Sequence, residues 1–213
     1  MKPIILIGGG GHCVSCIDVV ESTNEYKILG ILDLPDKFGE RICNYKVIGN
    51  DDDIHKFVLT CPNFLISVGQ INTSLLREEL FNKVKYAGGS LPVIISPNAY
   101  VSKYAKLEEG SVVMHHALVN ANVKVGACCI INTKSLVEHE SQIGNFSHIS
   151  TSAVINGQVK VGEKCFIGSN SVVGNNIEIV DKTVIAAGSQ VLKNIKIQGV
   201  YIGNPLRKIR ESL

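Results

Sequence analysis

The sequence predicts a two-part chain, in which a small α/β domain is followed by a parallel β-helix. Two observations carry this prediction. A six-residue repeat runs without insertion from Ile95 to Lys196, and before it apolar runs alternate with helical segments around a glycine-rich turn. A chain of 213 residues is long enough for two domains. We expect the α/β domain over residues 1–90 and the β-helix domain, with a C-terminal tail, over residues 91–213.

The repeat shows most clearly at its first position, where every residue is Ile, Val or Leu. These residues are Ile95, Val101, Leu107, Val113, Val119, Val125, Ile131, Val137, Ile143, Ile149, Ile155, Val161, Ile167, Val173, Ile179, Ile185 and Val191. The fifth position of each hexad is small or β-branched, as at Ser141 and Cys165. A period of six fits neither an amphipathic helix nor simple strand alternation, and it indicates a β-helix whose coils bury their apolar sides by stacking.

Three hexads are expected to form one triangular coil of the β-helix. In this interpretation the aliphatic residues fill the corners and the small residues fit the tight turns beside them. Glycine recurs one coil apart at Gly126, Gly144 and Gly162. We expect turn backbone with positive φ at these three glycines.

The N-terminal region reads as strands that alternate with helices, which is typical of a small, parallel, Rossmann-like βαβαβ sheet. The expected strands are Lys2–Ile7, Lys27–Leu32 and Asn63–Val68, and the expected helices are Val14–Ser22, Asp51–Thr60 and Thr73–Lys85.

A glycine-rich turn, Gly8–Gly11, follows the first strand and opens the first helix. Backbone N–H groups in such a turn can hold a phosphate. The full dinucleotide fingerprint fails, because Cys13 stands where the last glycine is required. Asp33, at the end of the second strand, could accept hydrogen bonds from a ribose or a base. Together they suggest a nucleotide-containing ligand rather than a hydride cofactor; a tight turn without a ligand is the alternative.

His139 is the candidate general base. It is the third residue of its hexad, away from the inward-facing first and fifth positions, and Glu140 follows it. One coil away on either side come Ala121 and Gly157, whose small size would leave a hollow around the imidazole. A histidine titrates near neutral pH, and a neighbouring carboxylate can fix its tautomer and raise its basicity. The alternative is a surface histidine beside solvated charges.

Two other kinds of site have weaker support. His115, His116, His139 and His148 are not separated by whole coils, so stacking would not gather them around a metal ion, and no metal is expected. Cys129 and Cys165 occupy the inward fifth position, and Cys13 and Cys16 fall in the first helix without other redox signals. We expect all the cysteines to be unreactive.

The composition of the chain bears on three further questions: nucleic-acid binding, cellular location and membrane insertion. The formal net charge is +2, without a basic patch, so a nucleic-acid partner is unsupported. The seven cysteines are irregularly spaced, which favours reduced thiols and a cytoplasmic location. The apolar run Ile4–Ile7 is too short for a membrane span.

Several of these features together resemble the NeuD/PglD/VioB family of sugar acetyltransferases. They are the glycine loop with His12, the strand that ends at Asp33, the Val68–Gln70 segment, the hexads and, most specifically, Ile131–His148. The resemblance implies a left-handed β-helix, a homotrimer, acetyl-CoA bound between neighbouring β-helices, and a nucleotide-activated amino sugar held by the N-terminal domain.

The resemblance also implies roles for matching residues. His139 matches the general base, and Glu140 matches the carboxylate that raises its basicity. The expected substrate contacts are Gly10, Gly11, His12, Asp33, Gly69 and Asn132. The expected acetyl-CoA contacts are His148, Ser169, Ala187, Gly203, Asn204 and Pro205. Leu34 departs from members that carry a second acidic residue there, which leaves the base or sugar preference open.

The resulting hypothesis is direct N-acetylation of the 4-amino group of a UDP- or dTDP-linked 4-amino-4,6-dideoxy sugar. One alternative keeps the donor and makes the acceptor a sialic acid hydroxyl. Another is a trimeric nucleotide-binding scaffold without catalysis, and a metal-dependent hydratase is the remaining one.

Overall fold

The computed structural model describes residues 1–204 and 206–211. The chain forms two compact units. One comprises Met1–Gly69 with Leu75–Ile94, and the other comprises Gln70–Ser74 with Ile95–Leu213. The short segment Gln70–Ser74 therefore belongs with the repeat region, although it lies within the N-terminal part of the sequence.

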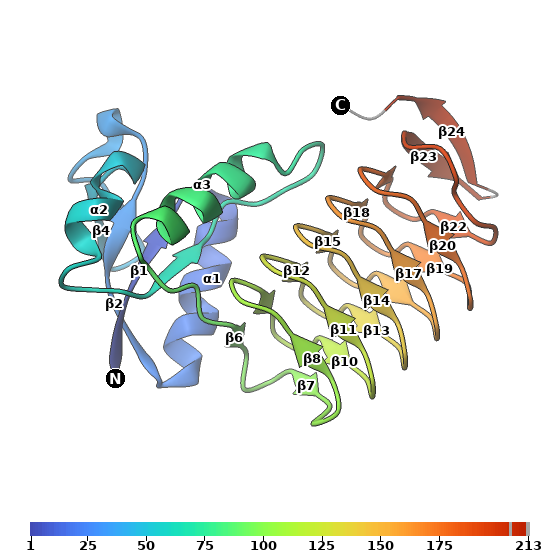
Figure 1. Ribbon diagram of the computed structural model, residues 1–213, viewed down its shortest axis with the longest axis horizontal. Helices are drawn as coiled ribbons and strands as arrows, with labels where there is room; N and C mark the ends of the chain where they lie inside the picture. The colour runs from blue at the N-terminus through green and yellow to red at the C-terminus, as the bar shows by residue number, and fades with distance from the viewer. Residues whose placement is uncertain (205, 212–213) are drawn as a thin grey trace. The chain divides into compact units, whose positions relative to one another are not determined.

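The first unit is built on a five-stranded sheet with the strand order β3-β4-β2-β1-β5 (Figure 1). The strands are β1 (Lys2–Ile7), β2 (Tyr26–Leu32), β3 (Arg41–Ile42), β4 (Tyr45–Gly49) and β5 (Phe64–Ile66). Strands β1, β2, β4 and β5 run parallel, and only β3 is antiparallel to its neighbour. Residues Ile4–Ile7 are buried, as expected for the central strand of a sheet covered on both faces. The predicted Rossmann-like α/β class is confirmed.

The helices of this unit are α1 (Gly11–Thr23), α2 (Ile54–Phe57) and α3 (Leu75–Tyr86), with short 3₁₀ turns η1 (Pro35–Lys37) and η2 (Asp51–Asp53). Helix α1 packs against β2, and α3 packs against β5. The predicted helix over Asp51–Thr60 is wrong in its extent. The Asn50 side chain accepts the Asp52 N–H and starts a 3₁₀ turn, and only one α-helical turn follows. The β3–β4 hairpin was not predicted, since β3 has only two residues and β4 only five, too few to show a strand pattern.

The second unit is a parallel β-helix of two-residue strands, one for each hexad (Figure 1). The strands are β6 (Ile94–Ile95), β7 (Tyr100–Val101), β8 (Lys106–Leu107), β9 (Val112–Val113), β10 (Leu118–Val119), β11 (Lys124–Val125), β12 (Ile130–Ile131), β13 (Leu136–Val137), β14 (Gln142–Ile143), β15 (His148–Ile149), β16 (Val154–Ile155), β17 (Lys160–Val161), β18 (Phe166–Ile167), β19 (Val172–Val173), β20 (Glu178–Ile179), β21 (Val184–Ile185) and β22 (Gln190–Val191).

Each strand pairs with the strand three places along the chain, so a residue aligns with the one 18 positions away, as Leu118 does with Leu136. Three sheets result, and they form the three sides of the coil. We name them by one member each: the β13 sheet (β7, β10, β13, β16, β19, β22), the β14 sheet (β8, β11, β14, β17, β20) and the β15 sheet, which holds the remaining strands from β6 onward. Three hexads per coil are therefore confirmed.

From Val113 onward the first and fifth residues of the hexads are buried in the core, as predicted, whereas Ile95 at the N-terminal end is exposed. In the coils around the candidate base Val137, Ser141, Ile143 and Cys165 are buried. The buried Ser141 hydroxyl donates to the Asn156 carbonyl at 2.8 Å, so a small polar residue is tolerated inside. The aliphatic residues line the flat sides of the coil, however, and the corners are formed by the third and fourth residues. The expectation of aliphatic corners was wrong.

The glycine prediction also needs correction. Positive φ falls at the fourth residue of the hexad, as at Glu140 (φ 61°) and Lys164 (φ 60°), and Gly126, Gly144 and Gly162 do not have it. A Cβ on Gly144 would lie 2.5 Å from the Glu163 nitrogen in the next coil. These glycines are required by the close approach of the stacked backbone, not by a turn conformation.

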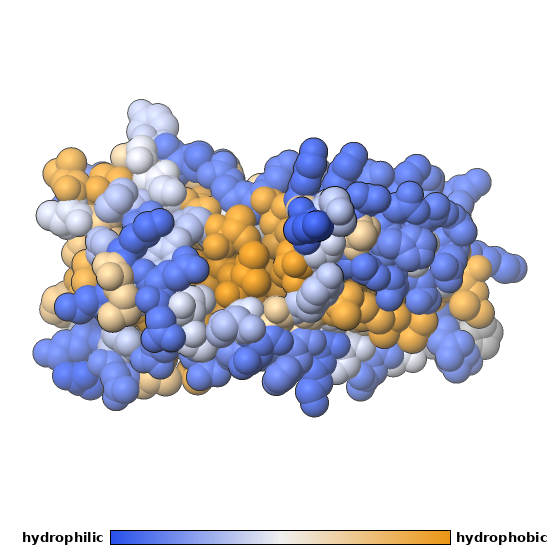
Figure 2. All heavy atoms as spheres, turned by 90° about the horizontal axis from the view of Figure 1, so that it is seen from below, coloured by the Kyte–Doolittle hydropathy of each residue, from blue (hydrophilic) through white to orange (hydrophobic). Residues whose placement is uncertain are grey.

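The C-terminal end of the solenoid carries an antiparallel hairpin of β23 (Val200–Gly203) and β24 (Leu206–Arg210). Strand β23 pairs with β21 and extends the β15 sheet. Figure 2 shows one face of the molecule, on which hydrophobic side chains gather in patches between hydrophilic ones. Among the described residues, no helix combines the length and the hydrophobicity that crossing a membrane requires.

Candidate active site

His139 lies at the corner between β13 and β14. Its neighbours in the inward positions, Val137 and Ser141, are buried, whereas 53% of the imidazole side chain is exposed. The side chain therefore points away from the solenoid core, as a group that meets a ligand must.

The imidazole lies over Gly157 of the next coil. A Cβ on Gly157 would lie 2.6 Å from both Cε1 and Nε2 of His139, closer than any side chain permits. The hollow predicted from the 18-residue spacing is therefore present, and glycine at position 157 is what leaves room for the ring.

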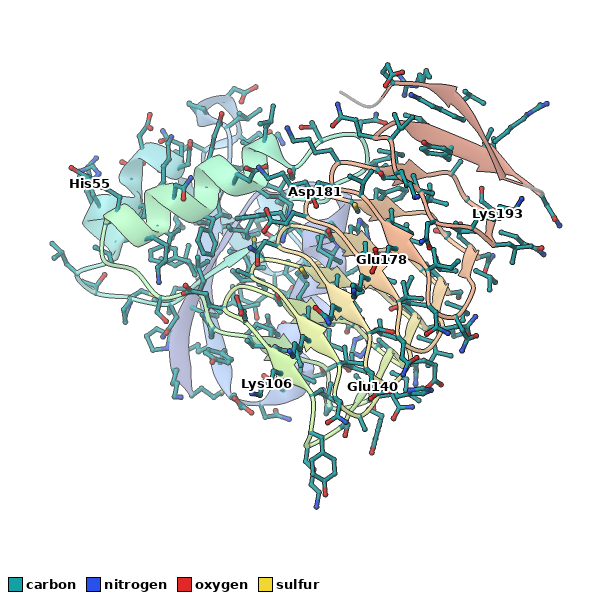
Figure 3. All side chains as sticks on the ribbon, turned by 45° about the vertical axis from the view of Figure 1, so that its right-hand side comes forward. His55, Lys106, Glu140, Glu178, Asp181 and Lys193 are labelled. Atoms are coloured by element: carbon teal, nitrogen blue, oxygen red, sulfur yellow. The ribbon has the colours of Figure 1, made fainter. Side chains whose placement is uncertain are left out.

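Glu140 provides the carboxylate partner. Its Oε2 lies 3.3 Å from His139 Nδ1 and accepts a hydrogen bond from Gln158 Nε2 at 2.9 Å. The Gln158 amide and, after it, the His139 ring lower the pKa of Glu140 below its ordinary value. Figure 3 shows Glu140 at the edge of the coils, to one side of the sheet that carries Lys106 and Glu178. An ionised Glu140 favours the proton on Nδ1 of His139, which makes Nε2 the proton acceptor.

The glycine that lies against this imidazole, Gly157, also carries a backbone N–H. At corresponding corners the Ala121 N–H donates to Asn120 Oδ1 (2.7 Å) and the His139 N–H to Glu138 Oε2 (3.3 Å). The Asn156 side chain instead donates to the Val173 carbonyl at 2.9 Å. The Gly157 N–H consequently has no hydrogen-bond acceptor within residues 1–204 and 206–211, and it can serve a ligand oxygen.

A second polar cluster is centred on His148, in β15. The ring is buried, its Nδ1 lies 2.7 Å from the Gln70 carbonyl oxygen, and its Nε2 lies 2.9 Å from Asn132 Nδ2. Phe166 packs edge-on against the ring at a centroid distance of 5.2 Å. Both ring nitrogens of His148 therefore have partners within the protein.

The two histidine clusters lie on opposite sides of the coil. His139 stands at the corner where the β13 and β14 sheets meet, and His148 lies on the third sheet, which faces that corner across the triangle. A single chain does not bring His139 and His148 together.

Ser169 and Ala187 share another corner, between the β15 and β13 sheets. They stack one coil apart, and the Gly188 N–H donates to the Ser169 carbonyl at 2.8 Å. Ser169 Oγ also lies 3.0 Å from Ser150 Oγ. This column borders the sheet that carries His148, so these expected acetyl-CoA contacts lie on one side of the solenoid.

The other acetyl-CoA contacts expected from sequence lie at the C-terminal hairpin. The Gly203 N–H donates to Ser189 Oγ at 3.2 Å, and Asn204 is exposed in the turn that follows. Pro205 lies outside the described residues.

In the first unit, the glycine loop meets the start of α1. Gly10 is the N-cap and has no side-chain cap, and a Cβ on Gly10 or Gly11 would meet no heavy atom within 4 Å. Gly8, by contrast, has φ 98° and lies tightly against Val68. Open space in front of the α1 N-terminus suits a phosphate, because its first N–H groups have no helical acceptor.

Asp33, His12 and Gly69 border the same loop. Asp33 Oδ2 lies 2.9 Å from Lys37 Nζ and adjoins Gly9, and a Cβ on Gly69 would lie 3.5 Å from His12 Cβ. The chain passes from β1 to β2 on one side and later to β5 on the other, so this edge is a topological switch point, where open α/β sheets bind ligands. The expected substrate contacts of this unit are therefore neighbours.

Arg77, Gln158 and Gln70 each contact an expected site residue or the backbone next to one, and no role was predicted for them. The buried Arg77 guanidinium donates to the carbonyls of Ile66 (3.1 Å) and Val68 (2.5 Å) and holds the segment before Gly69. Gln158 could have been found, since it is one coil from Glu140. No repeat relation links Gln70 to His148.

The cysteines are mostly buried. Burial raises the pKa of Cys13 to about 11 and those of Cys16 and Cys165 to about 12, which disfavours the nucleophilic thiolate. Only Cys43 is exposed. Within the described part of the chain, no cluster of three or more His, Cys, Asp or Glu could hold a metal ion.

Comparison with known proteins identifies the chain's relatives. Residues 3–84 match the model of the PglD N-terminal domain, and residues 92–204 match that of the GMPPB C-terminal domain. PerB from Caulobacter crescentus, solved with CoA and GDP-perosamine, is 28% identical, with 98% of each chain covered and a TM-score of 0.91. The chain belongs to the NeuD/PglD/VioB family of sugar acetyltransferases.

Two other solved structures are similar to this chain over almost its whole length. The acetyltransferase domain of PglB from Neisseria gonorrhoeae, solved with acetyl coenzyme A, is 26% identical, with 98% of this chain and 99% of that chain covered and a TM-score of 0.91. WeeI from Acinetobacter baumannii, at 20% identity and a TM-score of 0.84 over 98% of this chain and all of that one (100%), shares the fold. No protein with a curated description matches the sequence significantly. Membership in the family confirms that the β-helix is left-handed. It also makes the chain an acyltransferase.

Proposed function

We propose that this chain transfers the acetyl group of acetyl-CoA to the 4-amino group of a nucleotide-linked 4-amino-4,6-dideoxy sugar. The observation that carries the proposal is the outward imidazole of His139, seated over Gly157 and paired with Glu140. Relatives solved with CoA and GDP-perosamine, or with acetyl coenzyme A, support the two substrate classes.

Direct transfer needs one base and one oxyanion donor. The sugar amine attacks the thioester carbonyl, and His139 Nε2 takes a proton from the amine as the C–N bond forms. Glu140 stabilises the imidazolium. The tetrahedral intermediate then expels the thiolate of CoA, which receives the proton from the imidazolium.

The Gly157 N–H is suited to the oxyanion of this intermediate, because it belongs to the residue that lies against the imidazole and has no acceptor among the described residues. A preorganised donor of this kind contributes a few kcal/mol to the stability of the transition state.

The N-terminal unit is proposed to hold the nucleotide. The first N–H groups of α1 would donate hydrogen bonds to the diphosphate beside Gly10 and Gly11, with His12 next to it. Asp33, at the end of β2, would accept hydrogen bonds from the ribose or the base. UDP and dTDP are the nucleotides expected from the sequence, and the PerB complex adds GDP to those that must be compared.

We also propose a homotrimer, as in the family that the sequence resembles. Its support here is geometric. His139 and the column of Ser169 and Ala187 occupy different corners of one coil. A neighbouring copy would place His139 opposite that column and complete the site around acetyl-CoA, with Asn204 near the nucleotide end of the cofactor.

The decisive experiment measures thiol release from acetyl-CoA with a panel of acceptors. The panel contains the UDP-, dTDP- and GDP-linked 4-amino-4,6-dideoxy sugars, the matching 4-hydroxy sugars and sialic acid. The proposal expects release with an amino sugar and an acetamido product by mass spectrometry. Release with sialic acid alone would establish O-acetylation instead, and no release with any acceptor would support a scaffold.

A further inference from the structure

A directed chain of hydrogen bonds runs through the His148 cluster, all of it within the second unit. The Thr133 N–H donates to Asn132 Oδ1 at 2.7 Å, Asn132 Nδ2 lies 2.9 Å from His148 Nε2, and His148 Nδ1 lies 2.7 Å from the Gln70 carbonyl oxygen. Each distance is that of a short, well-formed hydrogen bond.

The direction of this chain is set by the main chain at both ends. A backbone N–H can only donate, so Asn132 presents its oxygen to Thr133 and its nitrogen to His148. A backbone carbonyl can only accept, so His148 Nδ1 carries a proton. Both ends lead independently to the same assignment, in which Nδ1 of His148 donates and Nε2 accepts. The amide orientation and the tautomer are therefore fixed together.

Gln70 anchors the far end of this chain. Its side chain is buried, and Nε2 donates to the Phe146 carbonyl at 2.7 Å and lies 3.5 Å from the Cys165 carbonyl in the next coil. Its Oε1 is buried without a hydrogen-bond partner among the described residues, a cost that the amide contacts must offset. Gln70 directly follows Gly69 in the sequence, so the anchor holds the residue next to an expected substrate contact.

One hydrogen of Asn132 Nδ2 is left over. The amide nitrogen has two hydrogens, and the structure describes a partner for one of them, His148. Asn132 is half-buried, whereas His148 is buried with both nitrogens engaged. Of the two side chains, Asn132 is the one that can still donate to an oxygen of a ligand.

We infer that Gln70 and His148 are positioning residues that orient the Asn132 amide, and that Asn132 is the residue of this cluster that contacts the ligand. This inference rests on the proposed function. It gives Asn132 an acceptor oxygen as its partner, either the acyl carbonyl of acetyl-CoA or an oxygen of the sugar. His148 serves the reaction through Asn132 and not by its own hydrogen bond to acetyl-CoA.

The first experiment reads the tautomer directly and does not depend on activity. The full chain is labelled with ¹⁵N and ¹³C histidine, and the His148 signals are assigned by their loss in His148→Phe. We expect the Nδ1–H tautomer in the wild type. An Nε2–H tautomer would overturn the inference, even if acetyl transfer is found.

The second experiment reverses the direction of the hydrogen bonds that link Asn132 to His148. Asn132→Asp keeps the acceptor for the Thr133 N–H but offers Nε2 no donor, so a proton is expected to move onto Nε2 of His148. Gln70→Leu removes the anchor and is expected to weaken the Nδ1–H signal. Asn82→Asp, at an exposed position of α3, is the matched control and should leave the His148 spectrum unchanged.

Binding and kinetics identify the acceptor oxygen. If the partner is the acyl carbonyl, Asn132→Asp weakens binding of acetyl-CoA by about tenfold and leaves binding of CoA unchanged. If it is a sugar oxygen, the KM of the amino sugar rises by a similar factor instead. Wild-type values for both ligands would remove Asn132 from the site. A wild type without any acetyl transfer would contradict the proposed function and leave the tautomer result standing.

Discussion

The imidazole of His139 and the Cα of Gly157 stack so closely that a Cβ on Gly157 would lie 2.6 Å from Nε2. The ring lies at the end of a side chain that is 53% exposed, so it could rotate away if a methyl group were added. The position of the candidate base therefore depends on a missing side chain one coil away.

Gly157→Ala is expected to displace the imidazole and to lower kcat by about tenfold to a hundredfold, with little change in thermal stability. Gly157 does not have positive φ, so alanine causes no backbone strain there. The control is Gly174→Ala, whose Cβ meets its nearest atom at an ordinary 3.4 Å. Equal activity of Gly157→Ala and the wild type would show that the ring position is unimportant.

His139→Ala should lower turnover by about a hundredfold or more, because it removes the base that takes the amine proton. The exposed ring contributes little to packing, so the melting temperature should stay near that of the wild type. Thiol release under saturating acetyl-CoA, together with differential scanning calorimetry, checks both parts. Turnover close to the wild type would mean that another group accepts the proton.

The lowered pKa of Glu140 predicts that the free energy of unfolding depends on pH. Its pKa in the folded chain is lowered by Gln158 and then by His139. The stabilisation that it contributes is therefore present above the ordinary glutamate pKa and is lost as the pH falls through the folded-state value. Glu140→Gln should be less stable than the wild type at pH 7, and the difference should shrink in strong acid.

The matched variant for this titration is Gln158→Leu, which removes the main cause of the shift. The carboxyl ¹³C signal of Glu140 should then titrate at higher pH than in the wild type. An unchanged titration midpoint would show that the Gln158 contact contributes nothing to the ionised state.

Two glycines of the solenoid should differ in what alanine costs. A Cβ on Gly144 would lie 2.5 Å from backbone atoms of the next coil, so Gly144→Ala should reduce the free energy of unfolding by about 3 kcal/mol. Gly188 has φ 69° and open space around it, so Gly188→Ala should cost only about 1 kcal/mol. Denaturant unfolding measures both, and the reverse order would contradict the stacking account.

Gly188→Asn is the control for backbone conformation. Asparagine tolerates left-handed backbone better than alanine does, and Asn170 and Asn176 already adopt it at other corners. Its free energy of unfolding should lie closer to that of the wild type than that of Gly188→Ala.

The sequence alone determined the coil and which residues face out of it, because a period of 18 relates each residue to its stacked neighbour by simple addition. The outward direction of His139, its carboxylate neighbour and the small residue at position 157 all follow from that spacing. The same addition leads from Glu140 to Gln158, so this partner was also within reach.

Only the tertiary structure decided the environment of His148. Its partner Gln70 lies 78 residues earlier in the sequence, outside the repeat, so no periodicity relates the two. The reason for Gly126, Gly144 and Gly162 also became clear only from stacked backbones, because composition cannot separate a glycine needed for its φ from one needed for space. Relations set by the local translation of the coil can be predicted from sequence, whereas contacts made by a segment from outside the repeat depend on how the whole chain folds back.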